Sequence, residues 1–488
     1  MLTRQIITPR ANVRWGLGVV DITPPIGIYH RMFGAATHDR ATGIHRPLQA
    51  DVIAVSSLEQ SKPGLIRGEL DHCGFVSSQH AELIRRVSLA ADISPEQVIV
   101  GYSHSHAAGW YTPDRFELPG GDLIPAYLTA IGDALETATR TAVADLAPAE
   151  ISYANSRCAM AAHRDCWDDE AGIFVCGTNP GGPCDERVTV GRVTSPEGRV
   201  RAVLVHYACH PTTLGWENSL ISPDFVGAMR ETVTSVTGAP CVFWQGASGD
   251  LGPRDGFVGD TAVADRNGRM LGFAALSALE ALGPAGTEFR YAGPVVSGAT
   301  LGAWKHQPLE PDHRPQRRGF GGRRGTVALP LRPRGEPAEL ERERVAWEAR
   351  AEEARRQVDQ KLARDCHAQA ERARRWIGRI AGLPPGDICH LSASVHVVGE
   401  SLWITSGGEP YQWLAAELRR RFPEYTVLYS PLVDGIQMGY LLPRSEYGRG
   451  LYQEEPSPLA SGCLELLFDA LVRRTEEVLA GRTAPADW

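Results

Sequence analysis

The stretch Val98-Ile-Val-Gly-Tyr-Ser-His104-Ser-His106 is an apolar run that ends in two histidines one residue apart. Side chains of a strand alternate between its two faces, so we expect His104 and His106 to leave the same face where the strand ends. Two histidines placed in this way are a common beginning of a metal site. Zinc requires three or four ligands, so other parts of the chain must supply the rest.

Two further apolar segments also end in side chains that can bind a metal. Residues 200–207 lead into His206 and His210, and residues 401–405 lead into Ser-Gly-Gly-Glu409. A single histidine is more often a hydrogen-bonded core or surface residue than a ligand. The shared placement after apolar strands, beside Gly or Pro, favours one common site.

Two other catalytic motifs are nearly matched, and both fail on one position. His206 and His210 have the spacing of the H-E-x-x-H metalloprotease helix, but Tyr207 stands in place of the glutamate and the preceding residues favour a strand. The sequence Gly-Ala-Ser248-Gly-Asp250 resembles a G-x-S-x-G nucleophile turn, but Asp250 replaces the last glycine. No acid-then-base order follows it, so a Ser248 nucleophile is disfavoured.

The order of predicted elements indicates an α/β protein. Predicted strands in the first 145 residues alternate with helices at 78–91 and 125–145, which is typical of a mixed or mostly parallel β-sheet flanked by helices. Residues 150–186 are rich in Gly, Pro and Asn and predict a loop. Such sheets gather their functional side chains at strand ends.

A charged insertion interrupts this pattern. Residues 305–335 are rich in Arg, Pro and Gly, and residues 338–377 contain neither Gly nor Pro. Apolar side chains recur there at three- and four-residue steps, which predicts a charged helical hairpin or one long helix. We therefore expect a catalytic α/β domain formed by 1–304 and 379–488, with 305–378 inserted. The insertion's charge is typical of a solvated face, but a lid or a homo-oligomer arm stays open.

Composition excludes several classes of partner. The 488 residues are 43% hydrophobic and 22% charged, with a net charge of −8, which argues against nucleic acid as the main partner. No apolar run approaches the roughly 18 residues of a membrane span. The N-terminus lacks a signal-peptide pattern, so we expect a cytoplasmic protein.

The chain has ten cysteines, which are too sparse for a disulfide scaffold. Four of them cluster at positions 158, 166, 176 and 184, but no C-x-x-C pair occurs there, which favours free thiols over a zinc knuckle.

Seven short motifs, in order between about residues 15 and 455, together resemble the catalytic domain of the neutral/alkaline (non-lysosomal) ceramidase family, whose members are zinc-dependent amide hydrolases. They are Gly18-Val-Val-Asp21-Ile-Thr-Pro-Pro, Gly43-Ile-His-Arg-Pro-Leu, Ser103-His-Ser-His106, Val205-His-Tyr-Ala-Cys-His210-Pro-Thr, Gly249-Asp250-Leu-Gly-Pro, Gly408-Glu409-Pro and Gly439-Tyr440.

The resemblance implies a ligand set and several catalytic roles. The Zn²⁺ ligands would be His104, His210, Glu409 and Tyr440, and His106 would be a nearby polar partner. Arg164 and Tyr452 would hold the substrate carbonyl and its developing oxyanion. One departure is Gly252, which stands where the family has a serine. Because the chain ends soon after these motifs and shows no export signal, we expect it to lack the β-sandwich domain of secreted ceramidases and to act on a substrate other than ceramide itself.

The resemblance implies hydrolysis of an amide bond, and the metal-binding residues would achieve it with zinc-activated water. Zinc lowers the pKa of a bound water toward roughly 7, so that it attacks the amide carbonyl at neutral pH. His106 or Asp71 would pass a proton to the leaving amine, and His106 is preferred because it is close in sequence to a ligand. We expect an N-acyl amide or another small-molecule amide as substrate. An esterase or lactonase using the same site and a non-catalytic binding protein are the alternatives.

Overall fold

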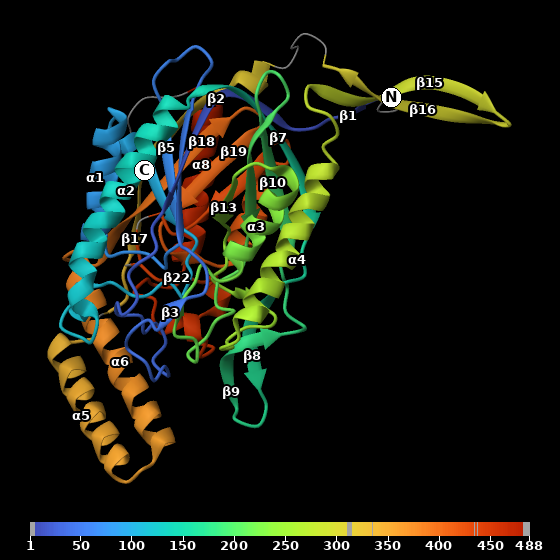
Figure 1. Ribbon diagram of the computed structural model, residues 1–488. Helices are drawn as coiled ribbons and strands as arrows, with labels where there is room; N and C mark the ends of the chain where they lie inside the picture. The colour runs from blue at the N-terminus through green and yellow to red at the C-terminus, as the bar shows by residue number, and fades with distance from the viewer. Residues whose placement is uncertain (1–4, 310–314, 334, 434, 437, 482–488) are drawn as a thin grey trace.

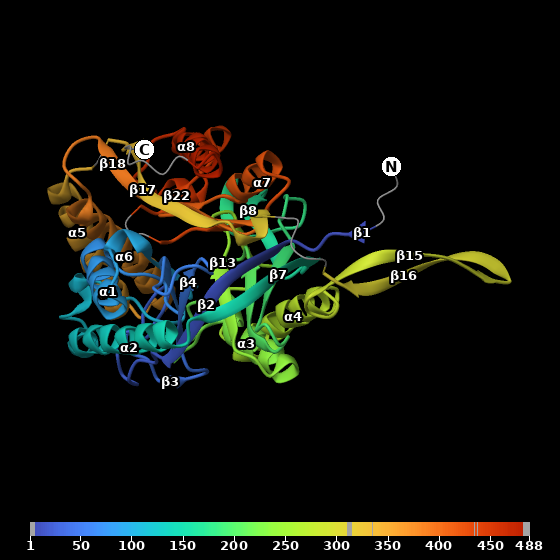
Figure 2. The ribbon, with the colours of Figure 1, turned by 90° about the horizontal axis from the view of Figure 1, so that it is seen from above.

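The computed structural model describes residues 5–309, 315–333, 335–433, 435, 436 and 438–481. Seen from above, the elements stack as helices, a first sheet, a second sheet and further helices (Figures 1 and 2). This four-layer sandwich is a mixed α/β architecture with helices on the outer faces of its sheets, as the sequence predicts.

The first sheet has eight strands, and its two edge pairs are parallel while the pairs between them are antiparallel. The prediction of a mixed β-sheet is therefore confirmed, and the alternative of a mostly parallel sheet is wrong. The spatial order is β13 (Cys241–Gln245), β11 (Val200–Tyr207), β10 (Arg187–Thr194), β7 (Ala147–Arg157), β2 (Arg10–Asp21), β4 (Gln49–Ser56), β5 (Leu65–Leu70) and β6 (Val98–Tyr102).

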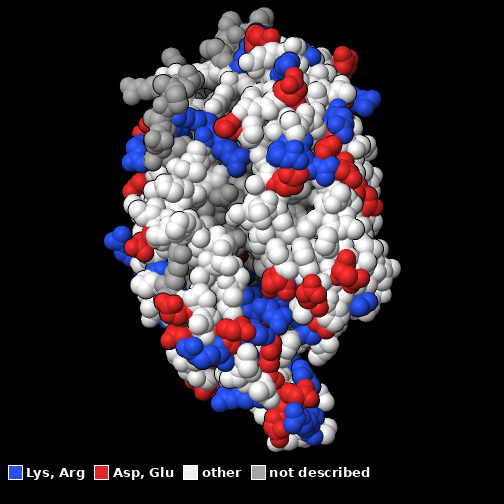
Figure 3. Space-filling view, turned by 90° about the vertical axis from the view of Figure 1, so that its left-hand side faces the viewer, with Lys and Arg blue, Asp and Glu red and all other residues white. Residues whose placement is uncertain are grey.

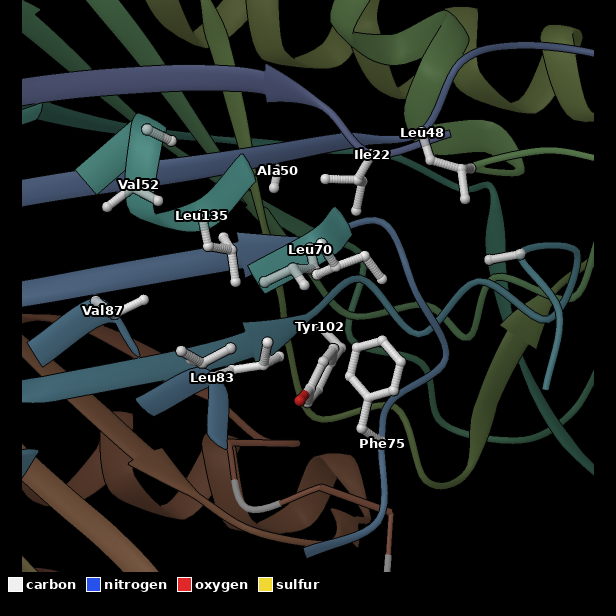
Figure 4. Packing of buried hydrophobic residues seen from close by; sticks show 14 of the residues in the cluster. Ile22, Leu48, Ala50, Val52, Leu70, Phe75, Leu83, Val87, Tyr102 and Leu135 are labelled. Carbon is white, nitrogen blue, oxygen red and sulfur yellow. The ribbon is translucent and has the colours of Figure 1, made fainter. Parts of the chain in front are cut away.

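Helices α1 (Ser77–Ala91), α2 (Ile124–Ala144), α3 (Phe225–Thr237) and α4 (Thr261–Glu280) cover the outer face of this sheet (Figure 2). The alternation of side chains along β4 explains how both faces are buried. Val52 packs in the cluster that α1 and α2 complete, together with Leu83 and Leu135 (Figure 4). Ile53, one residue on, packs toward the second sheet. Both faces of β4 therefore contribute to the core.

The second sheet packs on the first through three tryptophans. The ring centroid of Trp403 lies 6.4 Å from that of Trp15 and 4.8 Å from that of Trp244, both nearly edge-on. Helices α7 (Gln412–Arg421) and α8 (Cys463–Leu479) pack against this sheet and share a core cluster with it. Its strand order is β17 (Phe320–Pro330), β18 (Ile388–Val398), β19 (Ser401–Ser406) and β21 (Thr426–Ser430).

Short strands and turns complete the chain. The expected loop at 150–186 is wrong, because β7 ends in it and β8 (Ala161–Asp168) and β9 (Ile173–Asn179) form a hairpin beside β14 (Leu251–Pro253). The Gly and Pro residues there mark the turns between strands. Two long strands, β15 (Thr287–Ser297) and β16 (Ala299–Pro308), pair with each other. The other short elements are β1 (Gln5–Ile6), β3 (Gly43–Ile44), β12 (Leu220–Ile221), β20 (Glu409–Pro410), β22 (Tyr440–Leu441), η1 (Pro95–Gln97), η2 (Pro113–Arg115), η3 (Gly121–Leu123), η4 (Pro315–Arg318), η5 (Arg444–Glu446) and η6 (Tyr452–Glu454).

The predicted insertion contains a helical hairpin, α5 (Pro337–Arg356) and α6 (Gln360–Gly382), rather than one long helix. The turn between them places Val358 at φ 61°. Helix α6 is docked on the body, because Glu371 accepts hydrogen bonds of 2.9 and 2.7 Å from the buried Arg115 guanidinium. Figure 3 shows interspersed positive and negative groups on the protruding part of the molecule. Strand β17, also within 305–378, belongs to the second sheet, and the division into domain and insertion remains a prediction.

Two expectations from composition concern membranes and thiols. Among the residues that the structure describes, none of the helices combines the length and apolar character that crossing a bilayer requires. All ten cysteines are free thiols, and seven of them are buried. Free thiols are what the sparse cysteine spacing predicts. The cysteines of residues 158–184 do not form a metal-binding group within the described part of the chain.

Replacing Glu371 should destabilise the protein far more than replacing an exposed glutamate of the same hairpin. Glu371→Ala leaves the buried Arg115 without its bidentate partner, which costs about 3–5 kcal/mol for a buried pair. Glu339→Ala removes an exposed contact to Arg342 and should cost less than about 1 kcal/mol. Urea unfolding of both variants measures the difference. Equal losses would show that α6 is not anchored through Glu371.

Candidate metal centre

Segments that follow separate strands bring the predicted ligands together. His104 follows β6 and His210 follows β11, and the backbone N–H of His106 donates to the carbonyl of Pro211 at 3.2 Å, which joins the two loops. Glu409 begins β20 and is the register partner of Tyr440 in β22. The pairing of these two short strands therefore fixes Glu409 beside Tyr440.

The backbone and the ring of His104 are both held in place. His104 has a φ of 69°, an unusual conformation for a non-glycine residue, and its backbone N–H donates to the His72 carbonyl at 2.9 Å. Its Nδ1 lies 2.6 Å from the Cys73 carbonyl oxygen, which can only accept, so Nδ1 carries a proton. The opposite nitrogen, Nε2, lies 3.3 Å from Glu409 Oε2. A metal-binding histidine is commonly oriented in this way.

His210 is oriented in the same manner. Its Nδ1 lies 3.3 Å from the Ser248 carbonyl oxygen, and its Nε2 lies 3.7 Å from Glu409 Oε2. The ligand atoms of His104, His210 and Glu409 all lie within 4.8 Å of one another. Two imidazole nitrogens and one carboxylate oxygen thus face a common point.

The carboxylate of Glu409 has the features of a metal ligand. Its Oε2 is buried and has no hydrogen-bond partner, although a buried polar atom without a partner is costly. Burial raises the pKa of Glu409, but its neighbours His104, Arg164 and Tyr440 together outweigh burial and lower it. A lowered pKa favours the ionised form of this carboxylate, whose Oε2 faces the two imidazoles. Two imidazoles and a carboxylate match the donor preference of zinc.

Tyr440 and Arg164 form the next part of the site. The Tyr440 ring is stacked 6.3 Å from the His210 ring, and the Arg164 guanidinium carbon lies 5.2 Å from the centroid of the Tyr440 ring. Arg164, on β8, is buried and donates from Nη2 to the Gly249 carbonyl at 2.7 Å. Burial raises the pKa of Tyr440 well above its usual value, while the Arg164 charge opposes the shift. The structure thus places Arg164 beside Tyr440, and its role in binding the substrate stays a prediction.

His106 and Tyr452 flank the ligand group. His106 Nε2 lies 3.2 Å from His210 Nε2, and the His106 ring centroid is 5.0 Å from that of His104. Burial and the charge of His104 lower the pKa of His106 well below its usual value. Tyr452, on η6, is 50% exposed, and its ring centroid lies 5.9 Å from that of Tyr440. Tyr452 thus lies at the solvent-facing side of the site.

Asp71 has its contacts elsewhere. Its carboxylate is fully buried, forms an ion pair with Arg230 and accepts a hydrogen bond of 3.0 Å from the backbone N–H of Gln49. His106 contacts His210, a proposed ligand. Among the contacts described, Asp71 has none with a proposed ligand. The preference for His106 over Asp71 as the proton carrier therefore agrees with the geometry, and the role itself stays a prediction.

Two residues of the rejected motifs have structural contacts. His206 is buried, and its Nε2 lies 2.7 Å from the Tyr429 carbonyl oxygen, which joins the two sheets. The Ser248 hydroxyl accepts a hydrogen bond of 2.7 Å from the Gln245 side chain. The carbonyl of Ser248 orients His210, so this residue supports the site through its backbone.

Sequence reasoning missed three neighbours of the site. Cys73 is one, because its Sγ lies 3.6 Å from His104 Nδ1 and it forms a second possible ligand group with His104 and His106. Its position just after β5, a strand that pairs with β6, was an available signal. Arg375 and Arg379 of α6 are the others, since their charges act on His106 and Glu409 respectively. No local pattern indicates that this helix approaches the site.

Comparison with known proteins gives a structural likeness only. No model of a known protein family matches the chain, and neither does any curated protein. A crystal structure of neutral ceramidase from Pseudomonas aeruginosa superposes with a TM-score of 0.67 at 14% identity, covering 99% of this chain and 76% of that one. A ceramidase complexed with C2 gives a TM-score of 0.65 at 15% identity, covering 99% and 77%. The chain therefore has a neutral ceramidase-like fold, as the resemblance of its motifs implies.

Proposed function

We propose that this protein is a zinc-dependent amidase that hydrolyses the carbon–nitrogen bond of an N-acyl amide or another small amide. The observation that carries the proposal is the convergence of His104 Nε2 and His210 Nε2 on a buried Glu409 oxygen without a hydrogen bond. The ceramidases that share the fold support the same class of reaction.

The residues that would hold the metal are His104, His210, Glu409 and Tyr440. When bound, zinc supplies a Lewis acid that polarises the amide carbonyl and makes water a stronger acid. The carbonyls of Cys73 and Ser248 hold both imidazoles with Nδ1 protonated, so that each Nε2 is available as a ligand.

Arg164 and Tyr452 are suited to bind the substrate carbonyl oxygen. Arg164 is fixed by two hydrogen bonds to the Gly249 carbonyl, at 3.2 Å from Nε and 2.7 Å from Nη2. Tyr452 contacts the Tyr440 ring and is half exposed, which places it between the proposed ligands and solvent. Fixed donors stabilise the negative charge that develops on this oxygen in the transition state.

His106 is suited to move the proton. A carbon–oxygen bond forms as water attacks the carbonyl, and the carbon–nitrogen bond breaks when the nitrogen accepts a proton and leaves as an amine. His106 Nε2 accepts the proton released by water and donates it to the leaving nitrogen. Its position 3.2 Å from His210 Nε2 places it beside the reacting groups without requiring it as a ligand.

Removing a proposed ligand should remove both metal and activity. His210→Ala and Glu409→Gln are expected to lose stoichiometric zinc and to reduce amide hydrolysis by more than about 100-fold, because each replaces a ligand. His390→Ala changes an exposed histidine of β18 and should keep both. Elemental analysis by mass spectrometry and an amide hydrolysis assay are the measurements. Full activity in His210→Ala would refute the proposal.

Variants beside the ligands should separate metal binding from catalysis. His106→Gln is expected to keep zinc and to lower kcat by about 10²–10⁴-fold, because proton transfer is lost. Tyr452→Phe should keep zinc and lower kcat by about 10²-fold, because one donor to the carbonyl oxygen is lost. Assays with matched amide and ester substrates test whether the site prefers the amide. Loss of zinc in His106→Gln equal to that in His104→Ala would contradict this division of roles.

A further inference from the structure

A two-stranded ribbon projects from the body on the side away from the α5–α6 hairpin (Figures 1 and 2). It consists of β15 and β16, which pair from Thr287 with Pro308 to Ser297 with Ala299. Strand β1 pairs with β15 only at the root, through Gln5 and Ile6. We call this ribbon, residues 287–308, the arm. Two-stranded ribbons are marginally stable in water when they stand alone.

The outer part of the arm is uncharged and apolar. No Asp, Glu, Lys or Arg occurs from Tyr291 to Trp304, although 22% of the chain is charged. Three aliphatic side chains near its tip are 50 to 84% exposed, namely Val295, Val296 and Leu301. Solvent-exposed strands are normally protected by charges, so this composition indicates a surface that is covered.

The arm also presents an unpaired strand edge. In the part of the chain that the structure describes, β16 forms the edge of its three-stranded sheet, in the order β1, β15, β16. Its outward N–H and C=O groups can pair with another strand. A lipid bilayer cannot satisfy these groups, because hydrocarbon offers no hydrogen bonds. Of these two surfaces, only a protein strand can satisfy the outward groups of β16.

We infer that the arm binds the arm of a second copy of this chain, with the two β16 edges pairing antiparallel about a twofold axis. Antiparallel pairing of two identical edges is self-complementary, as a twofold interface requires. Each copy carries a net charge of −8, so the uncharged arm is a part through which two copies can approach with little repulsion. The arm projects from the body, which leaves room for the second body (Figure 2).

The sequence left open that two copies associate through the helical insertion. The inferred dimer instead forms through the arm. Helix α6 is occupied by its contacts with the body, including the buried ion pair between Glu371 and Arg115. Helix α5 carries many charged side chains that pair within the hairpin, such as Arg344 with Glu341 and Glu348. Charges already paired within one chain offer little for a second copy.

Sedimentation velocity of the full-length protein at micromolar concentrations tests the inference. The native chain is expected to be a dimer. The double variant Val296→Lys with Leu301→Lys should raise the dimer dissociation constant at least about tenfold, because one new charge lies on the pairing strand β16 and the other on the neighbouring strand β15 of each copy. Val345→Lys, on the exposed face of α5, is the matched control and should leave the dimer unchanged.

Hydrogen exchange supplies a second measurement that does not depend on the variants. The β16 amides of the native chain should be protected at concentrations that favour the dimer and lose that protection on dilution. A native chain that stays monomeric throughout, or a dimer disrupted by Val345→Lys and not by the arm variant, would overturn the inference. Monomeric protein that sediments with phosphatidylcholine vesicles through the arm would also overturn it.

Discussion

The carboxylate oxygen Oε2 of Glu409 is the atom on which the organisation of the site depends. It is buried without a hydrogen bond, and the Nε2 atoms of His104 and His210 lie 3.3 and 3.7 Å away. A buried negative charge is stable only when cations or hydrogen-bond donors face it. A proton on imidazole or a divalent metal ion meets this requirement. The fixed Nδ1 contacts of both histidines favour the metal.

The fold places this atom through the ends of its two sheets. The first sheet supplies His104 and His210 at the ends of β6 and β11, and the second sheet supplies Glu409 just after β19. The packing of Trp403 against Trp15 and Trp244 joins the sheets and fixes the distance between these ends. Stability of the core and geometry of the site are therefore linked, since a shift between the sheets would separate the proposed ligands.

Much of the fold and site could be predicted because the signals are local. Helices 78–91 and 125–145 were found within one residue of α1 and α2, and the strand ending before His104 was correct. The four proposed ligands followed from the family resemblance. Contacts between distant residues could not be predicted in this way. The ion pair of Asp71 with Arg230 and the approach of α6 to the site depend on packing that no short segment encodes. The strands within residues 150–186 were missed because the Gly and Pro residues of the turns between them make the whole segment resemble a loop.

The central claim is that His104, His210 and Glu409 bind zinc together. Anomalous scattering from a crystal of the purified protein, recorded on both sides of the zinc absorption edge, locates the metal directly. The account predicts one zinc peak within coordination distance of His104 Nε2, His210 Nε2 and Glu409. A peak at Cys73, His104 and His106 instead, or a zinc-loaded protein without a peak at Glu409, would contradict it.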